Sequence, residues 1–180
     1  PKLVLMDEPL GTIDLELRRE MRELIRTQQL EAGITTVYVT HDQEEARRLA
    51  DTLVVMNDGQ IRQVATPDEA YHHPADLFVA HFLGSPGMNF FAGAIERQEG
   101  RPLFRSSRGD LRLEVPRALR AGPVIVGLRP EALLPASGGP LRGRIQLNEY
   151  QGAWRNLHLE TDCGPCIARL AAAHRLQPGE

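Results

Sequence analysis

Between Leu3 and Met56, short apolar runs alternate with segments of helical periodicity, and this alternation restricts the fold more than any other feature. The run Leu3–Met6 is apolar at every position, which is typical of a strand buried on both faces. Ile34–Thr40 is rich in β-branched residues and predicts a second strand, and Thr52–Met56 predicts a third. Strand, helix, strand, helix, strand in this order predicts a parallel sheet with right-handed crossovers.

The helices of this half carry start and stop signals. Asp14 is placed to cap the first helix and Gly33 to end it, while Asp42 and Glu45 can form a capping box at the second. Asn57-Asp58-Gly59 predicts a hairpin, and Thr66-Pro67-Asp68-Glu69 predicts the start of a short helix, followed by another to about Leu83. On the first helix, the face expected to turn inward consists of Leu17, Met21, Leu24, Ile25 and Gln28.

The pattern changes near Gly84, after which Pro and Gly separate many short runs with strand character. Short strands at this spacing predict a small barrel or sandwich. The fold class is therefore α/β followed by an all-β domain. Seven strands are expected, near Phe90–Glu96, Leu103–Ser106, Leu111–Val115, Val124–Arg129, Leu141–Tyr150, Asn156–Thr161 and Cys166–Leu170.

Polar side chains follow the first two predicted strands where each one ends. Asp7 and Glu8 come directly after the first strand, and His41 follows the second. Parallel strands place their carboxyl ends at one edge of a sheet, where open α/β sheets bind ligands. A carboxylate there can hold Mg²⁺, a second can orient a water, and an imidazole can donate to a terminal phosphate.

A plainer interpretation exists for each of these residues. The two acids could cap the next helix, and a lone histidine more often packs or caps than binds a ligand. The combination at a separation of one crossover favours the phosphate site.

Together with the segments around them, these residues resemble the ATPase subunits of ABC importers, in the carbohydrate-uptake branch. The segments that carry the resemblance are LVLMDEP, GTID, TTVYVTHDQEEA, ADTLVVMNDGQI, QVATPDEAYHHP, FVAHFLGSPGMNFF and VIVGLRPEALL. The resemblance implies part of a P-loop NTPase sheet over residues 1–84. It implies an OB-like, transport-associated domain for regulation and dimerisation over residues 85–180.

The same resemblance implies a role for each matching residue. Asp7 matches the Walker B acid that holds Mg²⁺ through water, and Glu8 matches the catalytic, water-polarising acid. Asp14 matches the D-loop acid that reaches across a nucleotide-sandwich dimer, and it can cap a helix as well. His41 matches the switch histidine that contacts the γ-phosphate. Gly11 departs from the family, which usually has Ser there, so a hydroxyl that could contact the opposite subunit is missing.

The implied cofactors and partners follow from the family. They are ATP and Mg²⁺, a second ATPase subunit in a homodimer or heterodimer, transmembrane permease subunits and, indirectly, a solute-binding protein. A regulatory protein can bind the β domain of some members. The implied location is the cytoplasmic face of the cell membrane, and the implied cargo is a sugar or glycerol-phosphate.

Three family motifs do not occur in the sequence: the G-x-x-x-x-G-K-[ST] phosphate loop, the LSGGQ-type signature and a glutamine loop. We therefore expect a fragment, cut at both ends, that hydrolyses no ATP by itself because no amides and lysine cradle the phosphates. The alternative function is a non-catalytic module for dimerisation or regulator binding. A DNA-repair ABC ATPase would share the acids and the histidine but not GSPGMNFF or the β domain.

Composition argues against two other classes. The net charge of −3 and scattered arginines disfavour a nucleic-acid binder, which needs clustered basic residues. Cys163-Gly164-Pro165-Cys166 has the spacing of a thioredoxin motif but joins two strand-like runs, so a β-turn is expected. Two cysteines in 180 residues make no disulfide framework and are consistent with a reducing compartment.

Overall fold

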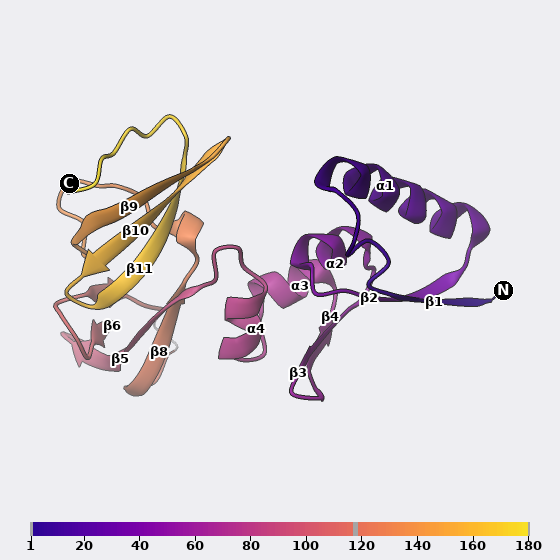
Figure 1. Cartoon of the computed structure of the whole chain (residues 1–180). Helices are drawn as coiled ribbons and strands as arrows, with labels where there is room; N and C mark the ends of the chain where they lie inside the picture. Colours follow the sequence, from indigo (N-terminus) through magenta and orange to yellow (C-terminus); the bar gives the residue numbers. More distant parts are fainter. Residues whose placement is uncertain (1, 117–118, 180) are drawn as a thin grey trace. The chain divides into compact units, whose positions relative to one another are not determined.

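The computed structural model describes residues 2–116 and 119–179, and the chain forms two compact units that meet between Leu83 and Gly84. Each unit has its own core and is described separately. The order of elements along the chain is shown in Figure 1. Among the described residues, no helix has the length and apolar character needed to cross a membrane.

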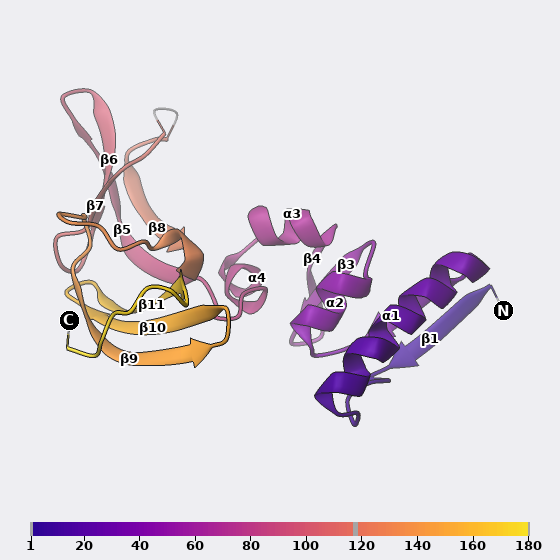
Figure 2. The same cartoon turned by 90° about the horizontal axis from the view of Figure 1, so that it is seen from above.

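The N-terminal unit is an α/β unit built around two short sheets. Strand β1 pairs in parallel with β2, with Leu5 opposite Val37, and α1 lies along one face of this pair (Figures 1 and 2). Its elements are β1 (Leu3–Asp7), α1 (Leu15–Ala32), β2 (Thr35–Val39), α2 (Gln43–Leu49), β3 (Leu53–Asn57), β4 (Gln60–Ala65), α3 (Pro67–His72) and α4 (Leu77–Phe82).

The expectation that the first strand is buried on both faces is wrong. Val4 and Met6 are half-buried, but Leu3 and Leu5 on the other face are 51% and 72% exposed. Val37, in register with Leu5, is exposed as well. The apolar run predicted the strand correctly. The second face is exposed because the single helix α1 can cover only one face of this two-stranded sheet.

The third strand does not join the parallel sheet, which also differs from the expectation. Instead β3 pairs antiparallel with β4 through the hairpin at Asp58 and Gly59, whose positive φ angles of 49° and 72° suit a tight primed turn. The core of this part is a cluster formed by the hairpin and the two short helices after it. Its buried members are Leu53, Val55, Ala70, Val79 and Leu83.

The predicted caps of α1 are confirmed, and its predicted inward face is confirmed only in part: Met21 and Ile25 are half-buried, whereas the other three residues are exposed. Asp14 accepts a hydrogen bond from the Leu17 amide at 3.0 Å, and Gly33 ends the helix with a left-handed φ of 58°. Arg22 is buried, whereas Leu17 and Leu24 are about half exposed. The inward face is shifted by about one residue, with Arg18 3.9 Å from buried Glu45 of α2 and Arg22 3.9 Å from Glu44.

The other two caps differ from each other. Asp42 caps α2 by accepting from the amides of Glu44 and Glu45, but the Glu45 side chain turns inward, so the reciprocal bond of a capping box does not form. At α3 the predicted capping box between Thr66 and Glu69 is complete.

The C-terminal unit is all-β, and the seven predicted strands are confirmed with shifted ends. Four strands form one antiparallel sheet in the order β7-β6-β5-β8, and three form another in the order β11-β10-β9. Its elements are β5 (Asn89–Gln98), β6 (Arg101–Ser106), β7 (Arg112–Glu114), β8 (Gly122–Leu128), the 3₁₀ turn η1 (Pro130–Ala132), β9 (Gly143–Gln151), β10 (Trp154–Thr161) and β11 (Gly164–Ala171).

Asn89 joins the two sheets of this unit by hydrogen bonds. Its side-chain amide donates to the carbonyls of Leu128 in β8 and Ile167 in β11, and its oxygen accepts from the Ile167 amide at 2.8 Å. Because the side chain is buried, these bonds satisfy both of its polar ends. One apolar cluster, around Phe91 and Phe104, combines residues of both sheets, and a second is formed by Ile145, Leu157 and Leu170 of the three-stranded sheet.

The turn predicted for the Cys-Gly-Pro-Cys segment is confirmed only at its start: Cys163 lies in a turn, and Gly164–Cys166 belong to β11. Asp162 and Cys163 form the loop between β10 and β11, where Thr161 pairs with Gly164. Both thiols are free, and burial raises the pKa of the Cys166 thiol to about 11. A buried thiol that resists ionisation is a packing group rather than a nucleophile.

Candidate functional site

The backbone holds Glu8 at the carboxyl end of β1 in an unusual conformation. Its φ of 46° lies in the left-handed region, which non-glycine residues seldom occupy. The Glu8 amide donates to the Val39 carbonyl at 2.9 Å, and the Glu8 carbonyl accepts from the Gly11 amide at 3.2 Å. Strain of this kind persists where surrounding contacts enforce it, and it is frequent at functional sites.

His41 lies at the carboxyl end of β2, and its two neighbours in the chain are both held. The Asp42 amide donates to the Thr40 hydroxyl at 3.0 Å, and the Asp42 carboxylate caps α2. His41 itself meets Glu8: its Nδ1 is 2.6 Å from Oε1 and 2.5 Å from Oε2. The structure therefore brings these two predicted site residues into direct contact.

Charge at this contact favours a protonated imidazole. The hydrogen bond to Glu8 and the Coulomb attraction of Glu8 raise the pKa of His41 above 6.5. The pair is open to solvent, with the side chains 77% and 42% exposed. Since a carboxylate only accepts, Nδ1 carries a proton, and Nε2 is the atom left for an external group. On an imidazolium, Nε2–H is a donor suited to an anion.

The other two predicted residues lie on either side of Glu8 along the chain. Asp7 is exposed, is in register with Val39, and shares the uncovered face of the sheet with Leu5. Asp14 begins α1, where its carboxylate is engaged as the N-cap. A Cβ added to Gly11 would lie 3.4 Å from Glu8 Oε2, so the side chain at that position bears directly on the carboxylate.

The strand end offers too few oxygen ligands to hold Mg²⁺ alone, so phosphate oxygens would have to complete the coordination. Asp7 offers one hard carboxylate, and Mg²⁺ commonly takes one or two carboxylates together with waters and substrate phosphates. Within residues 2–116 and 119–179, no three His, Cys, Asp or Glu side chains gather as a metal cage. A single Asp7 carboxylate fits a Mg²⁺ that takes its other ligands from water and phosphate.

A buried ionic group behind His41 was not recognised from the sequence. Glu45 is only 2% exposed, and its Oε2 accepts from the Tyr38 hydroxyl at 3.1 Å and the Thr40 hydroxyl at 3.0 Å. Burial and the nearby Glu45 charge raise the pKa of the Tyr38 phenol. The buried position of Glu45 was missed because a capping box already accounts for a glutamate three residues after Asp42, and a capping glutamate is normally exposed. Nothing in the helical pattern singled out Arg18, which lies 3.9 Å from Glu45, or the buried Arg22 as inward-facing residues.

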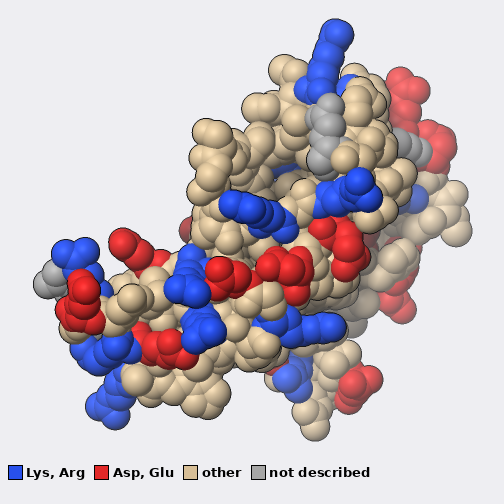
Figure 3. Space-filling view, turned by 90° about the vertical axis from the view of Figure 1, so that its left-hand side faces the viewer, with Lys and Arg blue, Asp and Glu red and all other residues tan. Residues whose placement is uncertain are grey.

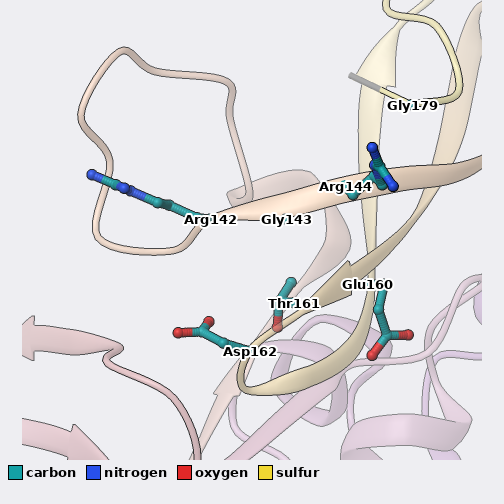
Figure 4. Close-up of a pocket in the computed structure, with 7 residues that line it drawn as sticks. All are labelled: Arg142, Gly143, Arg144, Glu160, Thr161, Asp162 and Gly179. Atoms are coloured by element: carbon teal, nitrogen blue, oxygen red, sulfur yellow. The ribbon is translucent and has the colours of Figure 1, made fainter.

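An open depression on the C-terminal unit is a poorer candidate. It is lined by Arg142, Gly143, Arg144, Glu160, Thr161, Asp162 and Gly179. Figure 4 shows the two arginines and the two acids projecting in different directions, so no set of groups converges on a point. On the face shown in Figure 3, Lys and Arg are interspersed with Asp and Glu, and no band of one sign runs across the described residues there.

Comparison with known families identifies the two parts of the C-terminal unit. Residues 84–133 match the family described as MalK OB fold domain. Residues 126–180 match the TOBE domain family.

Relatives match over both units. A glycerol-3-phosphate import ATP-binding protein, UgpC, from Paracoccus denitrificans is 48% identical over all of this chain and half of its own length. UgpC 1 from Rhizobium johnstonii is 42% identical with the same coverage. An uncharacterised ABC transporter ATP-binding protein, YurJ, from Bacillus subtilis is 40% identical over all of this chain and 53% of its own length.

The chain therefore spans about half the length of the curated relatives that it matches. The two domain matches and these relatives agree with the motifs at the ends of β1 and β2. The chain belongs to the family of ABC-importer ATP-binding proteins, in the branch that carries a MalK-type OB fold and a TOBE domain.

Proposed function

We propose that this chain forms the water-activating part of an ABC-type ATPase that energises import of a sugar or glycerol-phosphate. The observation that carries the proposal is the direct contact between Glu8 and His41 at the ends of two adjacent parallel strands. The cargo is inferred from relatives named as glycerol-3-phosphate import proteins. The proposed domain assignment is a partial nucleotide-binding domain over 1–84 and a regulatory β domain over 85–180.

In this mechanism Glu8 polarises the attacking water. Its carboxylate has a second face available, since the pair with His41 leaves it 42% exposed. His41 Nε2–H donates to an oxygen of the terminal phosphate, where negative charge develops during phosphoryl transfer. The Nδ1 contact orients the imidazole and keeps Nε2 directed outward. The left-handed Glu8 backbone fixes the acid at the strand end.

Asp7 is the proposed ligand of Mg²⁺, through water, and ATP is the proposed substrate. When bound, Mg²⁺ neutralises charge on the β- and γ-phosphates. Asp14 would serve twice, as the cap of α1 and as an acid presented to a second ATPase subunit. The proposed partners are that subunit, the permease, indirectly a solute-binding protein, and a regulatory protein on the β domain. The proposed location is the cytoplasmic membrane surface.

A second function is favoured by the contrast between the two units. The C-terminal unit contains two apolar cores of its own, and the phosphate-loop pattern does not occur in these 180 residues. The 180 residues by themselves would then act only in dimerisation or regulator binding. We expect no ATP turnover from them, and nucleotide binding by the isolated chain separates the two functions.

The test is ATP hydrolysis by the full protein that the gene encodes. We expect Glu8→Gln to lower magnesium-dependent turnover by about 10²- to 10⁴-fold, the usual contribution of a general base. Glu16→Gln, an exposed acid in the first turn of α1, is the matched control and should leave turnover unchanged. Wild-type turnover in Glu8→Gln would refute the proposal. Turnover by the 180 residues that Glu8→Gln removes would refute their expected inactivity.

A further inference from the structure

The contact between Glu8 and His41 is too exposed to fix its own geometry. Ion pairs in solvent contribute little net stability, because holding two side chains together costs entropy. Each partner also sits on a loop, and these loops follow different strands. The β1–β2 pairing and the Glu8 amide bond to Val39 align the strand ends, so a less exposed contact is needed only for the loops beyond them.

Arg18 of α1 contacts both loops with one guanidinium group. Its Nη2 donates to the Ile13 carbonyl at 3.0 Å, in the loop that follows Glu8. Its Nη1 is 3.5 Å from the Asp42 carboxylate, directly after His41. Its Nε makes no hydrogen bond but lies 3.9 Å from the carboxylate of buried Glu45, close enough for charge attraction. A planar guanidinium has fixed donors in several directions, so it can join three segments at once.

Thr40 completes the connection on the other side of His41. Its hydroxyl donates to Glu45 at 3.0 Å and accepts from the Asp42 amide at 3.0 Å. The residues before and after His41 are thus linked to the same buried carboxylate through the Thr40 hydroxyl, and the Arg18 charge lies beside both Asp42 and Glu45. This arrangement leaves the His41 backbone little freedom to move relative to Glu8.

We propose that Arg18, anchored on buried Glu45, is a positioning residue that sets the register between the Glu8 loop and the His41 segment. A catalytic role for Arg18 rests on the proposed function, but its effect on the placement of Glu8 relative to His41 does not depend on ATP. Lysine cannot replace arginine here, because an ammonium lacks the fork that reaches Ile13, Asp42 and Glu45 together.

The test reads the His41 pKa by NMR titration of the 180-residue chain, with the His41 signal assigned by its loss in His41→Gln. We expect Arg18→Lys to lower the His41 pKa toward 6.5, as Glu8→Gln does. Arg26→Lys is the matched control, since Arg26 on the same helix pairs with exposed Asp51 and should leave the His41 pKa unchanged. A wild-type His41 pKa in folded Arg18→Lys would overturn the proposal.

Thr40→Val decides the case if Arg18→Lys does not fold. This nearly isosteric change removes the hydroxyl bonds to Glu45 and Asp42 without touching Glu8 or His41. A lowered His41 pKa in Thr40→Val supports the positioning network, and an unchanged pKa overturns it.

Turnover of the full protein separates this inference from the proposed function. We expect Arg18→Lys to lower kcat by about 10- to 100-fold with little change in KM for ATP, since misplacement by about 1 Å has effects of this size. If Arg18→Lys lowers the His41 pKa while Glu8→Gln hydrolyses ATP normally, positioning stands and the proposed function fails. If Glu8→Gln abolishes turnover while Arg18→Lys changes neither pKa nor kcat, positioning fails.

Discussion

The two units of this chain are stabilised in different ways. The C-terminal unit contains two apolar clusters, with Phe104 fully buried in one of them. In the N-terminal unit, the β1–β2 sheet leaves Leu3, Leu5 and Val37 exposed, and a buried ionic group around Glu45 lies between its helices. The residues proposed for chemistry belong to the unit with the smaller apolar core. The difference shows that placing polar groups at a strand edge does not require a complete core beneath them.

Amide hydrogen exchange should show the largest difference between the units. An isolated two-stranded sheet is marginal in water, so Leu3–Met6 should exchange by local opening at little cost. Amides of β5 and β6 should exchange only through global unfolding, at least about 10³-fold more slowly given typical domain stabilities. Exchange measured by NMR or mass spectrometry that is equally slow in both segments would break the comparison.

Truncation of apolar side chains should give the second-largest difference between the units, measured as loss of stability. Phe104→Ala removes a fully buried ring and should destabilise the C-terminal unit by about 3–5 kcal/mol. Leu5→Ala, at a side chain 72% exposed, should change stability by no more than about 0.5 kcal/mol. Denaturant unfolding followed by tryptophan fluorescence, from Trp154 in β10, and by helical circular dichroism reports on each unit. Similar losses in the two variants would contradict the account.

The N-cap of α1 should have a smaller effect, confined to the N-terminal unit. Asp14→Ala removes the acceptor of the Leu17 amide and should cost about 1 kcal/mol of helix stability. Asp14→Asn preserves the cap and removes the charge, so its helical signal should match the wild type. A loss of turnover in full-length Asp14→Asn at unchanged stability would then report the proposed contact with a second subunit. Equal stability of Asp14→Ala and wild type would show that the cap is dispensable.

Gly11 offers the subtlest change. A serine there would add a hydroxyl beside Glu8, because its Cβ would lie 3.4 Å from Glu8 Oε2. This donor would compete with His41 for the carboxylate, so the His41 pKa should fall slightly in Gly11→Ser. Gly11→Ala adds the carbon without the donor and should have less effect. An NMR titration that finds no difference between the two variants would exclude the competition.

The sequence predicted best where local signals decide the structure. The seven strands of the β domain, the Asp14 and Thr66 caps and the hairpin at Asp58-Gly59 all follow from side chains within a few residues. The third strand of the parallel sheet and the double burial of β1 were wrong, because strand pairing and covering layers depend on distant segments.

Part of the candidate site could be predicted from the sequence, because strand ends can be located from local signals. Residues at the ends of successive parallel strands must share an edge, which placed Glu8 and His41 together. Arg18 and Glu45 were not predictable, because charged residues on helices ordinarily face solvent and only tertiary packing buries them. The inward rotation of α1 by about one residue has the same origin.

The central claim is that Glu8 and His41 act as a pair. It predicts how the stability of the fold depends on pH. The folded-state pKa of His41 is raised, so the pair stabilises the fold below about pH 6.5, and this stabilisation is lost as pH rises through the folded pKa. The most direct measurement is an NMR titration of His41 in wild type and Glu8→Gln. The account predicts a wild-type pKa above 6.5 that falls when the carboxylate is removed. A His41 pKa that is the same in both proteins would contradict it.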